Sequence, residues 1–409
     1  MAKREFDLIL YGATGFTGRL VARHLYARYG SDGDLRWALA GRNTDKLEEL
    51  RKELQGRSRK TKLSLITADS SDSDAVYEMT ARSKVVCSTV GPYARYGSLL
   101  VEACSRQGTD YCDLTGEVQW IARMIDRHQS DAEHSGARIV HSCGFDSVPS
   151  DLGNLFIQTA MQENFGTPAT RVRGRLGKAS GGASGGTVAS LLGVLEEASG
   201  NATLRRQLQN KYLLYPQGEP PGPEVRDQYT PRYEAAFSKW TCPFVMATIN
   251  ERVVRRSNAV MGFPWGREFD YDEAQLCDNR AQAVAFTAGL GVVAAISGTR
   301  LGRSLLKPVL PKPGSGPDTQ TREEGFFNLH IHAEHPQESS KCLRATVYGD
   351  RDPGYGATSK MLGEAAACLA FDAPQTEGGV WTPASALGFP FLERLEKHAG
   401  ISFTLDENF

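Results

Sequence analysis

The chain has 409 residues, of which 40% are hydrophobic and 23% are charged, the profile of a folded, soluble protein rather than a disordered one. This length is too great for one ordinary core, so two domains are expected. The 47 basic and 48 acidic residues nearly cancel, which argues against nucleic acid as a partner because phosphate binding needs a basic surface.

The cysteines and the first residues bear on the cellular setting. None of the eight cysteines falls in a Cys-x-x-Cys pair, so neither a zinc ribbon nor a redox dithiol is indicated. The chain runs from its start into an apolar strand without the basic leader, apolar run and cleavage site of a signal peptide. We therefore expect a reducing, cytoplasmic setting with free thiols.

The first third of the chain alternates between short apolar runs and segments with helical spacing. Strands are predicted at residues 6–11, 37–40, 62–67, 84–90, 109–113 and 137–141, and helices at 16–29, 45–54, 74–82, 98–107 and 118–134. Such alternation is typical of βαβ units in a parallel, doubly wound sheet. The sequence therefore predicts an α/β Rossmann domain over residues 1–149.

A glycine pattern, Gly12-Ala-Thr-Gly15-Phe-Thr-Gly18, directly follows the first strand and opens the first helix. In this context the glycines permit a tight turn, the approach of a pyrophosphate and close helix–strand packing. Amides at the start of the helix then bind the phosphates. The predicted cofactor-binding residues here are Gly12, Thr14, Gly15, Phe16, Thr17 and Gly18. The alternative is a tight turn without a ligand.

The second strand ends in Ala-Gly-Arg42-Asn43, with Lys46 one turn further on. NAD enzymes usually place an acidic residue here to bind the ribose 2′-hydroxyl. A guanidinium instead matches a 2′-phosphate in charge and geometry. Arg42, Asn43 and Lys46 therefore favour NADP(H) over NAD(H), the alternative being a surface arginine that caps the strand.

The fourth strand ends in Val90-Gly91-Pro92, followed by Tyr93 and Tyr96. Ligands of such sheets sit beyond the carboxyl ends of the strands, so these three residues are predicted to lie against the cofactor. Tyr93 and Tyr96 are the candidate proton donors. The fifth and sixth strands end in polar runs, residues 113–117 and 142–147, for which site, core and turn roles remain equally open.

The regular alternation of predicted strands and helices ends after residue 149. A glycine-rich turn at residues 181–187 precedes a predicted helix through Leu195, and residues 215–233, with five prolines, indicate a surface loop or lid. Residues 326–333 and 341–348 alternate like strands of a mostly antiparallel sheet. We expect this region, residues 150–351, to form a second, α+β domain with a mixed or antiparallel sheet.

Residues 281–299 carry no charge and are followed by Arg300, Arg303 and Lys307. The length meets the roughly 20 residues of a spanning helix, but alanine and glycine make it weakly apolar. A buried or interface helix is expected. Peripheral membrane contact and a true span are the alternatives.

Two other groups of residues could be interpreted as a nucleophile or a metal site, but we predict neither. Cys143 follows His141 without a visible orienting partner, so a buried thiol is expected rather than a nucleophile. His330, His332, Glu334 and His335 resemble a metal cluster, but exposed polar faces of strands look the same and no metal is predicted.

Taken together and in order, the motifs resemble those of the saccharopine dehydrogenase-like oxidoreductases, and within these the bacterial trans-acting enoyl reductases. The runs that carry the resemblance are LILYGATGFTGRL, ALAGRN, STVGPYARYGSLLVEAC, GTDYCDLTGE, IVHSCGFDSVPSDLG, SGGT, DPGYGAT and WTPASALG. The resemblance implies that residues 352–409 complete the Rossmann domain, and that Gly12, Gly15, Gly18 and Arg42 bind NADP(H). Saccharopine dehydrogenases proper bind an amino-acid conjugate through arginines that no motif marks here.

The leading hypothesis is NADPH-dependent reduction of a carbon–carbon double bond in an acyl or lipid-like substrate. Tyr93 or Tyr96 would donate the proton, and residues 215–233 and 281–299 would line or cover the apolar channel. One alternative is an imine-forming amino-acid dehydrogenase, which needs converging Arg or Lys side chains. Another is a non-catalytic NADP-binding protein docked on a membrane or a synthase. A homodimer is also open.

Overall fold

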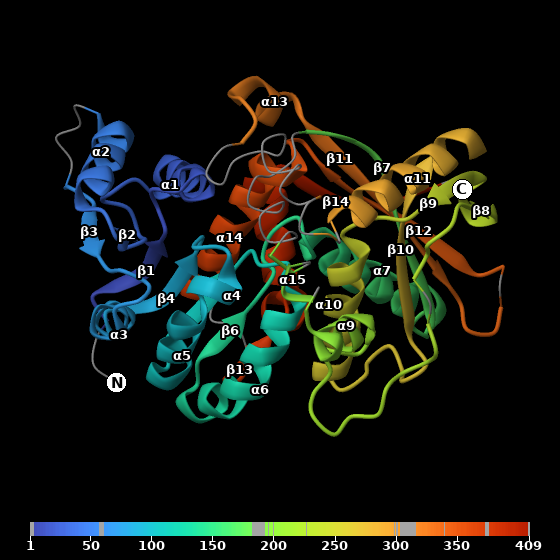
Figure 1. Cartoon of the computed structure of the whole chain (residues 1–409), viewed down its shortest axis with the longest axis horizontal. Helices are drawn as coiled ribbons and strands as arrows, with labels where there is room; N and C mark the ends of the chain where they lie inside the picture. Colours follow the sequence, from blue (N-terminus) through green and yellow to red (C-terminus); the bar gives the residue numbers. More distant parts are fainter. Residues whose placement is uncertain are drawn as a thin grey trace.

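The architecture was analysed in a computed structural model. It describes residues 4–56, 61–181, 193–194, 196–198, 200–225, 227–297, 299, 302, 316–338, 340–372 and 376–407. Residues 182–187 of the glycine-rich turn predicted at 181–187 therefore lie outside the described residues, as does most of the helix expected after it. Two seven-stranded sheets organise the rest (Figure 1).

The first sheet is parallel throughout, in the order β13-β6-β5-β4-β1-β2-β3. Its strands are β1 (Phe6–Tyr11), β2 (Trp37–Gly41), β3 (Ser64–Thr67), β4 (Ser83–Ser88), β5 (Asp110–Asp113), β6 (Arg138–Val140) and β13 (Gly379–Trp381). Every residue of β1 is buried, as expected of a central strand covered on both faces. The sheet confirms the Rossmann-type α/β fold.

Helices cover both faces of this sheet because alternate strand residues point to opposite sides. Leu8 and Leu10 belong to a core shared with α1, α2 and α14, whereas Ile9 and Tyr11 belong to a core shared with α3, α5 and α6. The helices are α1 (Phe16–Tyr29), α2 (Thr44–Gln55), α3 (Ser73–Ala81), α4 (Tyr93–Tyr96), α5 (Ser98–Gln107), α6 (Val118–Ser135) and α14 (Thr358–Phe371).

The second sheet has the order β14-β12-β11-β7-β10-β9-β8. Its strands are β7 (Arg171–Ser180), β8 (Arg232–Glu234), β9 (Lys239–Cys242), β10 (Asp270–Cys277), β11 (Phe326–Glu334), β12 (Cys342–Gly349) and β14 (Ile401–Leu405). Strands β11 and β12 confirm the two predicted strands. The sheet is mixed, because β7 and β10 pair in parallel while their neighbours pair antiparallel.

The remaining elements connect the strands of the second sheet or pack between the two sheets. They are α7 (Val148–Phe165), α9 (Ala202–Gln209), η1 (Ala235–Phe237), α10 (Ala247–Val260), α11 (Arg280–Ser297), α13 (Thr319–Glu324), η2 (Pro353–Ala357), α15 (Pro383–Arg394) and η3 (Leu395–Ala399). Helices α14 and α15 lie between the sheets (Figure 1). One apolar core runs from β1 through α14 and α7 to β11 and β12.

The C-terminal chain contributes a strand to each sheet. Strand β13 pairs in parallel with β6, and β14 pairs antiparallel with β12. Between these strands, Thr382 caps α15 by accepting a hydrogen bond from the amide of Ser385. The last segment of the chain therefore fixes how the two sheets lie relative to each other.

Two segments of the middle region were predicted to line or cover an apolar channel, and both lie at the surface. The proline-rich loop, residues 215–233, lies at the surface, and none of its described residues is fully buried. Helix α11 confirms the expected helix, but a buried helix was wrong: of its residues only Ala283 and Ser297 are buried.

A buried carboxylate ties α14 to two other helices, and its removal tests this packing. Glu364 is fully buried and accepts from His24 on α1 at 2.8 Å and from Arg394 on α15 at 3.3 Å. Burial alone would raise the pKa of Glu364, but His24, Arg28 and Arg394 lower it overall. Its stabilising contribution is therefore present above the ordinary glutamate pKa and is lost as the pH falls.

We expect Glu364→Gln to lower the free energy of unfolding at neutral pH by about 3 kcal/mol, because it removes the buried charge that Arg394 and Arg28 pair with. Denaturant titration measures this. The matched control Glu393→Gln removes an exposed pair with Lys397 and should cost less than about 1 kcal/mol. Equal effects of the two substitutions would contradict the assignment.

Candidate functional site

A cavity of about 650 Å³ opens beyond the carboxyl ends of β1, β4, β5 and β6. Its other walls come from α9, from the start of α10 and from η2. This is the edge at which open α/β sheets bind their ligands. The predicted glycine loop, the end of β2 and the Gly91-Pro92 turn all reach this one cavity.

The glycine motif forms the wall nearest β1. Gly12 has φ +84°, and a Cβ there would lie 2.7 Å from the Val90 side chain. A Cβ on Gly18 would lie 2.2 Å from the Gly12 carbonyl oxygen, so α1 can begin this close to the strand only with glycine at that position. Gly15, Phe16 and Thr17 line the cavity at the start of α1.

The start of α1 fits a pyrophosphate. No acidic residue occupies its first turn, and Gly15 provides no side chain to cap it. The first amides of a helix have no partner within the helix, and they carry the positive end of its dipole. Close backbone approach, free donors and positive potential are what a dinucleotide phosphate requires.

Arg42 lines the same cavity from the end of β2, where an adenosine 2′-phosphate would lie. Its neighbours have other positions. The Asn43 side chain caps α2 by accepting from the amide of Lys46 at 2.9 Å, and Lys46 itself is exposed and outside the cavity wall. Thr14 and Val90 also lie outside the wall; Val90 packs behind Gly12.

The Gly91-Pro92 turn and Tyr93 line the cavity, whereas Tyr96 does not. Tyr93 is buried, and its hydroxyl donates to the carbonyl oxygen of Ser88 at 3.1 Å. Burial and the nearby Asp113 raise the pKa of Tyr93 well above its ordinary value. The geometry therefore gives Tyr93 a structural hydrogen bond rather than a free, acidic hydroxyl.

Glu117 connects two of the loops that surround the cavity. Its carboxylate accepts from the amides of Tyr93 at 2.9 Å and Ala94 at 2.8 Å, at the start of α4. Its own amide donates to the hydroxyl of Thr115, in the same loop after β5. This buried carboxylate therefore holds the turn after β4 against the turn after β5.

Asp146, after β6, is a carboxyl group that lines the cavity. Burial, with the carboxylate of Glu273 nearby, raises the pKa of Asp146 to about 7. The adjacent Ser147 donates to Asn250, which in turn donates to Glu273 at 2.8 Å. A carboxyl poised between its charged and neutral forms near neutral pH is typical of a general acid or base.

The wall opposite the sheet is apolar. It is formed by Val194, Leu208, Val245, Met246 and Ile249, and Val118 adds an apolar side chain from the start of α6. Besides Arg42, Arg252 is the only arginine or lysine among the described residues that line the cavity. Its guanidinium donates to the backbone oxygens of Leu208, Asn210 and Thr248, so it ties α9 to α10 rather than facing a ligand.

Comparison with known proteins agrees with this site. Residues 8–140 match the model of the saccharopine dehydrogenase NADP binding domain. A protein of Mycobacterium tuberculosis provisionally named a trans-acting enoyl reductase is 43% identical over 98% of this chain and 97% of its own. The trans-acting enoyl reductase of Mycobacterium ulcerans is 36% identical over 96% of each chain. The chain belongs to the family of the trans-acting enoyl reductases.

The fold has a solved counterpart as well. Saccharopine dehydrogenase (L-Glu forming) from Saccharomyces cerevisiae superposes with a TM-score of 0.57 at 15% identity, covering 98% of this chain and 100% of that one. With the family and the cavity in agreement, this reductase family member is an NADP-dependent oxidoreductase, as the sequence predicted.

Sequence reasoning missed part of the reductase's cavity. Pro353, Gly354, Tyr355 and Thr358 line it from the C-terminal segment, and the Tyr355 ring meets Phe16 edge-on at 4.6 Å between centroids. These residues lie in the quoted run DPGYGAT, which had been given no role. Residues 245–252 carry no motif, and only folding brings them to the site.

Two predicted cavity elements were wrong. Neither the proline-rich loop nor α11 contributes a described residue to the wall of the cavity. The loop leads into β8 at the edge of the second sheet, and α11 follows β10 on that same sheet. Gln217 of the loop donates to Asp126 on α6 at 3.0 Å, so the loop runs over the surface beside the first domain. Helix α11 packs against Cys242 and Cys277 of the second sheet.

The structure shows the surroundings of Cys143 and of the histidine cluster, for which the sequence analysis predicted neither a nucleophile nor a metal site. Cys143 is fully buried, and burial raises the pKa of its thiol well above its ordinary value. His141, also buried, bonds Asp113 at 2.7 Å behind the cavity wall. The expected buried thiol is therefore confirmed.

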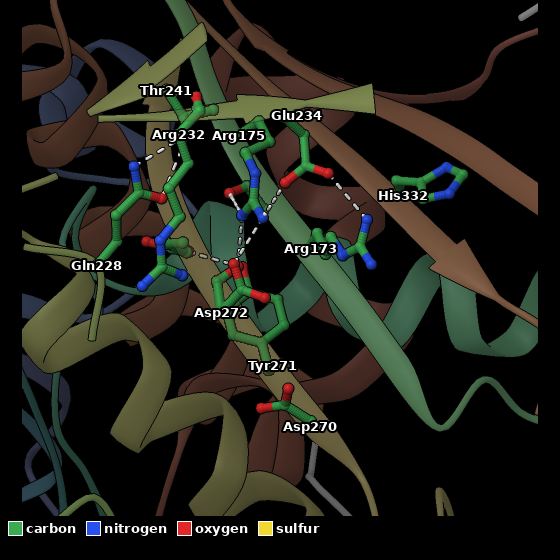
Figure 2. A network of polar contacts seen from close by, with 12 residues as sticks. Arg173, Arg175, Gln228, Arg232, Glu234, Thr241, Asp270, Tyr271, Asp272 and His332 are labelled. Atoms are coloured by element: carbon green, nitrogen blue, oxygen red, sulfur yellow. Dashed lines mark hydrogen bonds and ion pairs between the residues drawn. The ribbon is translucent and has the colours of Figure 1, made fainter. Parts of the chain in front are cut away.

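His332 lies beside an ion-pair network on the second sheet, shown in Figure 2. Arg173 pairs with Glu234 and Glu334, and Arg175 pairs with Glu234 and Asp272, at 2.6 to 2.9 Å. No group of three potential metal ligands occurs among the described residues. The carboxylates near His332 form ion pairs with the guanidinium groups of Arg173 and Arg175.

The proposed contact of Arg42 with the 2′-phosphate predicts a change in cofactor choice. We expect Arg42→Gln to weaken NADPH binding by about 10-fold or more while leaving NADH binding nearly unchanged, because a charge-assisted bond is lost. Calorimetric titration with both dinucleotides measures this. The control Arg23→Gln, on the exposed face of α1 and paired with Glu53, should change neither affinity.

Proposed function

We propose that this oxidoreductase reduces the carbon–carbon double bond of an α,β-unsaturated acyl substrate with NADPH. The observation that carries the proposal is the apolar wall opposite the cofactor loops, which suits an acyl chain. The names of the relatives, trans-acting enoyl reductases, point to the same chemistry.

The positively charged side chains of the cavity argue against the alternative function, an amino-acid dehydrogenase. An amino-acid substrate carries carboxylates, and these need converging, unengaged cations. Among the described lining residues, Arg42 lies at the β2 end and Arg252 is engaged by three backbone oxygens. The carboxylate of Glu117, which also lines the cavity, adds no positive charge that could bind a substrate carboxylate. These charges favour an acyl substrate.

Bound NADPH supplies the hydride to the β-carbon of the substrate. The electron pair of the double bond then moves toward the carbonyl group and leaves an enolate, which needs a proton at the α-carbon. Asp146 is placed to supply it, because its carboxyl lines the cavity and its raised pKa leaves much of it protonated near neutral pH. The carboxylate left behind takes a proton from solvent.

The surroundings of Asp146 explain why its proton is retained and its position fixed. The Glu273 carboxylate, held by Tyr271 at 2.6 Å and Asn250 at 2.8 Å, disfavours a second charge nearby. The Ser147–Asn250 hydrogen bond anchors the adjacent backbone to α10. In this proposal Glu273 and Asn250 are positioning residues, and Asp146 is the proton donor in place of Tyr93 or Tyr96.

A substrate panel tests the reaction class. We expect NADPH oxidation with α,β-unsaturated acyl thioesters, rising with acyl length as more of the apolar wall is covered. Amino acids with NADP⁺, and 2-oxo acids with NADPH and an amine, should give no turnover above background. Turnover confined to the amino-acid panel would overturn the proposal.

The role of Asp146 predicts a pH profile. A general acid must be protonated, so kcat should fall as the pH rises through about 7, the pKa of Asp146. Asp146→Asn should lower kcat by about 100-fold or more and remove this limb, with NADPH affinity retained. Steady-state kinetics across the pH range measures both effects.

Two controls accompany this experiment. Tyr96→Phe alters a hydroxyl outside the cavity wall and should leave kcat unchanged. Because the pKa of Asp146 is raised from 3.8 to about 7 in the folded state, the stability of the fold falls as the pH rises between these two values and stays lower above them. Asp146→Asn should therefore raise the melting temperature at pH 7 and above. A fall in kcat together with a lower melting temperature would indicate misfolding rather than loss of the proton donor.

A further inference from the structure

Helix α11 exposes a large apolar surface that no described part of the chain covers. Its side chains Val284, Phe286, Val292, Val293 and Ile296 are 38% to 58% exposed. Its two buried residues lie in the first turn and at the last position: Ala283 contacts a small cluster of Cys242 and Cys277, and Ser297 ends the helix. The helix stands at the periphery of the molecule in Figure 1.

The second half of the helix is apolar and exposed on every side. All residues from 291 to 296 are exposed, and they comprise Gly, Val, Ala and Ile alone. A second protein or a second copy of this chain covers one face of a helix and leaves the others in water. A helix that is apolar all round is stable only where apolar surroundings enclose it, as lipid does.

A true membrane span is incompatible with the sheet topology. By length and composition α11 is the one helix among the described residues that passes as a candidate span. However, the strand before it, β10, and the strand after it, β11, both pair with β7 in one sheet. The chain that leaves β10 must return to β11 in the same sheet, on the same side of a membrane. Helix α11 can therefore enter only one leaflet.

Basic residues flank α11 at both ends, and aromatic rings lie at its start, which suits a lipid headgroup layer. Arg280, its first residue, lies over the Trp240 ring, and Tyr233 beside Trp240 is 57% exposed. In the sequence, Arg300, Arg303, Lys307 and Lys312 follow the helix with no acidic residue before Asp318. Basic residues at both ends of an apolar helix are complementary to anionic lipid.

We propose that α11 inserts its distal half into one leaflet of an anionic lipid bilayer and holds the enzyme at the membrane surface. The bilayer covers the exposed residues of α11 on all sides, and the flanking arginines and lysines bind the phosphate groups of the lipid. The cavity lies elsewhere in the fold, so this anchoring is independent of the proposed reaction.

Vesicle flotation of the full-length protein tests the proposal. We expect the protein to float with phosphatidylcholine vesicles that contain phosphatidylglycerol, and less with phosphatidylcholine alone. The double variant Val292→Asp/Val293→Asp should lower the bound fraction by about 10-fold or more, because two charges would have to enter the apolar layer. Arg280→Gln should reduce the preference for anionic vesicles.

A control changes another exposed large side chain, elsewhere on the second sheet. Tyr348→Ser, on β12, alters a residue that is 40% exposed and should leave flotation unchanged. NADPH affinity should be the same in all variants, since none of these residues lines the cavity. This measurement also shows that the variants are folded.

Three outcomes would overturn the proposal. The first is no flotation of the wild type with either vesicle. The second is flotation that the double variant does not reduce. The third is a dimer, detected by light scattering without vesicles, that the double variant dissociates; that result would assign α11 to an interface between two copies of the chain.

Discussion

The approach of α1 to the turn after β1 is the constraint on which the cofactor site depends. A Cβ at position 18 would lie 2.2 Å from the Gly12 carbonyl oxygen and 2.9 Å from the Cα of Ala13, both backbone atoms that cannot move aside. Glycine here lets the helix begin in contact with the strand end. Its first amides then face the cavity, where a pyrophosphate binds.

From this wall the cavity is completed by segments distant in sequence. The loops after β4, β5 and β6 form the rim, and Glu117 joins two of them through a buried carboxylate. Residues 353–358 close the side near Phe16, and Thr358 accepts from the amide of Phe145. Both ends of the chain therefore contribute to one site, which links cofactor binding to the docking of the C-terminal segment.

Charged and apolar side chains are distributed in this cavity according to its two functions, which are to bind a charged cofactor and an apolar substrate. Positive potential is concentrated near the start of α1 and at Arg42, where phosphates would lie. Across the cavity, Arg252 is engaged by backbone oxygens and the wall is apolar. Asp146 lies in this second part, where burial and Glu273 favour its neutral form. The sites for a charged cofactor and an apolar substrate are thus separate parts of one space.

The local pattern of the sequence determined the Rossmann sheet, the glycine loop and the preference for NADP(H). Each depends on residues within one βαβ unit, where alternation, glycine positions and Arg42 act over a few residues. The seventh strand, β13, was missed because three residues, Gly379–Trp381, show no periodicity by themselves. It becomes a strand only because β6 offers a free edge beside it.

Tertiary structure decided the rest of the site and the exposure of α11. Tyr93 looked like a proton donor in the sequence, but packing buries its hydroxyl against Ser88. The pKa of Asp146 is raised mainly by burial and further by Glu273, 127 residues further along the chain. An apolar run predicts a helix equally well in a core or at a surface. Only the position of α11 at the edge of the second sheet leaves it uncovered, because burial depends on what the rest of the chain brings against it.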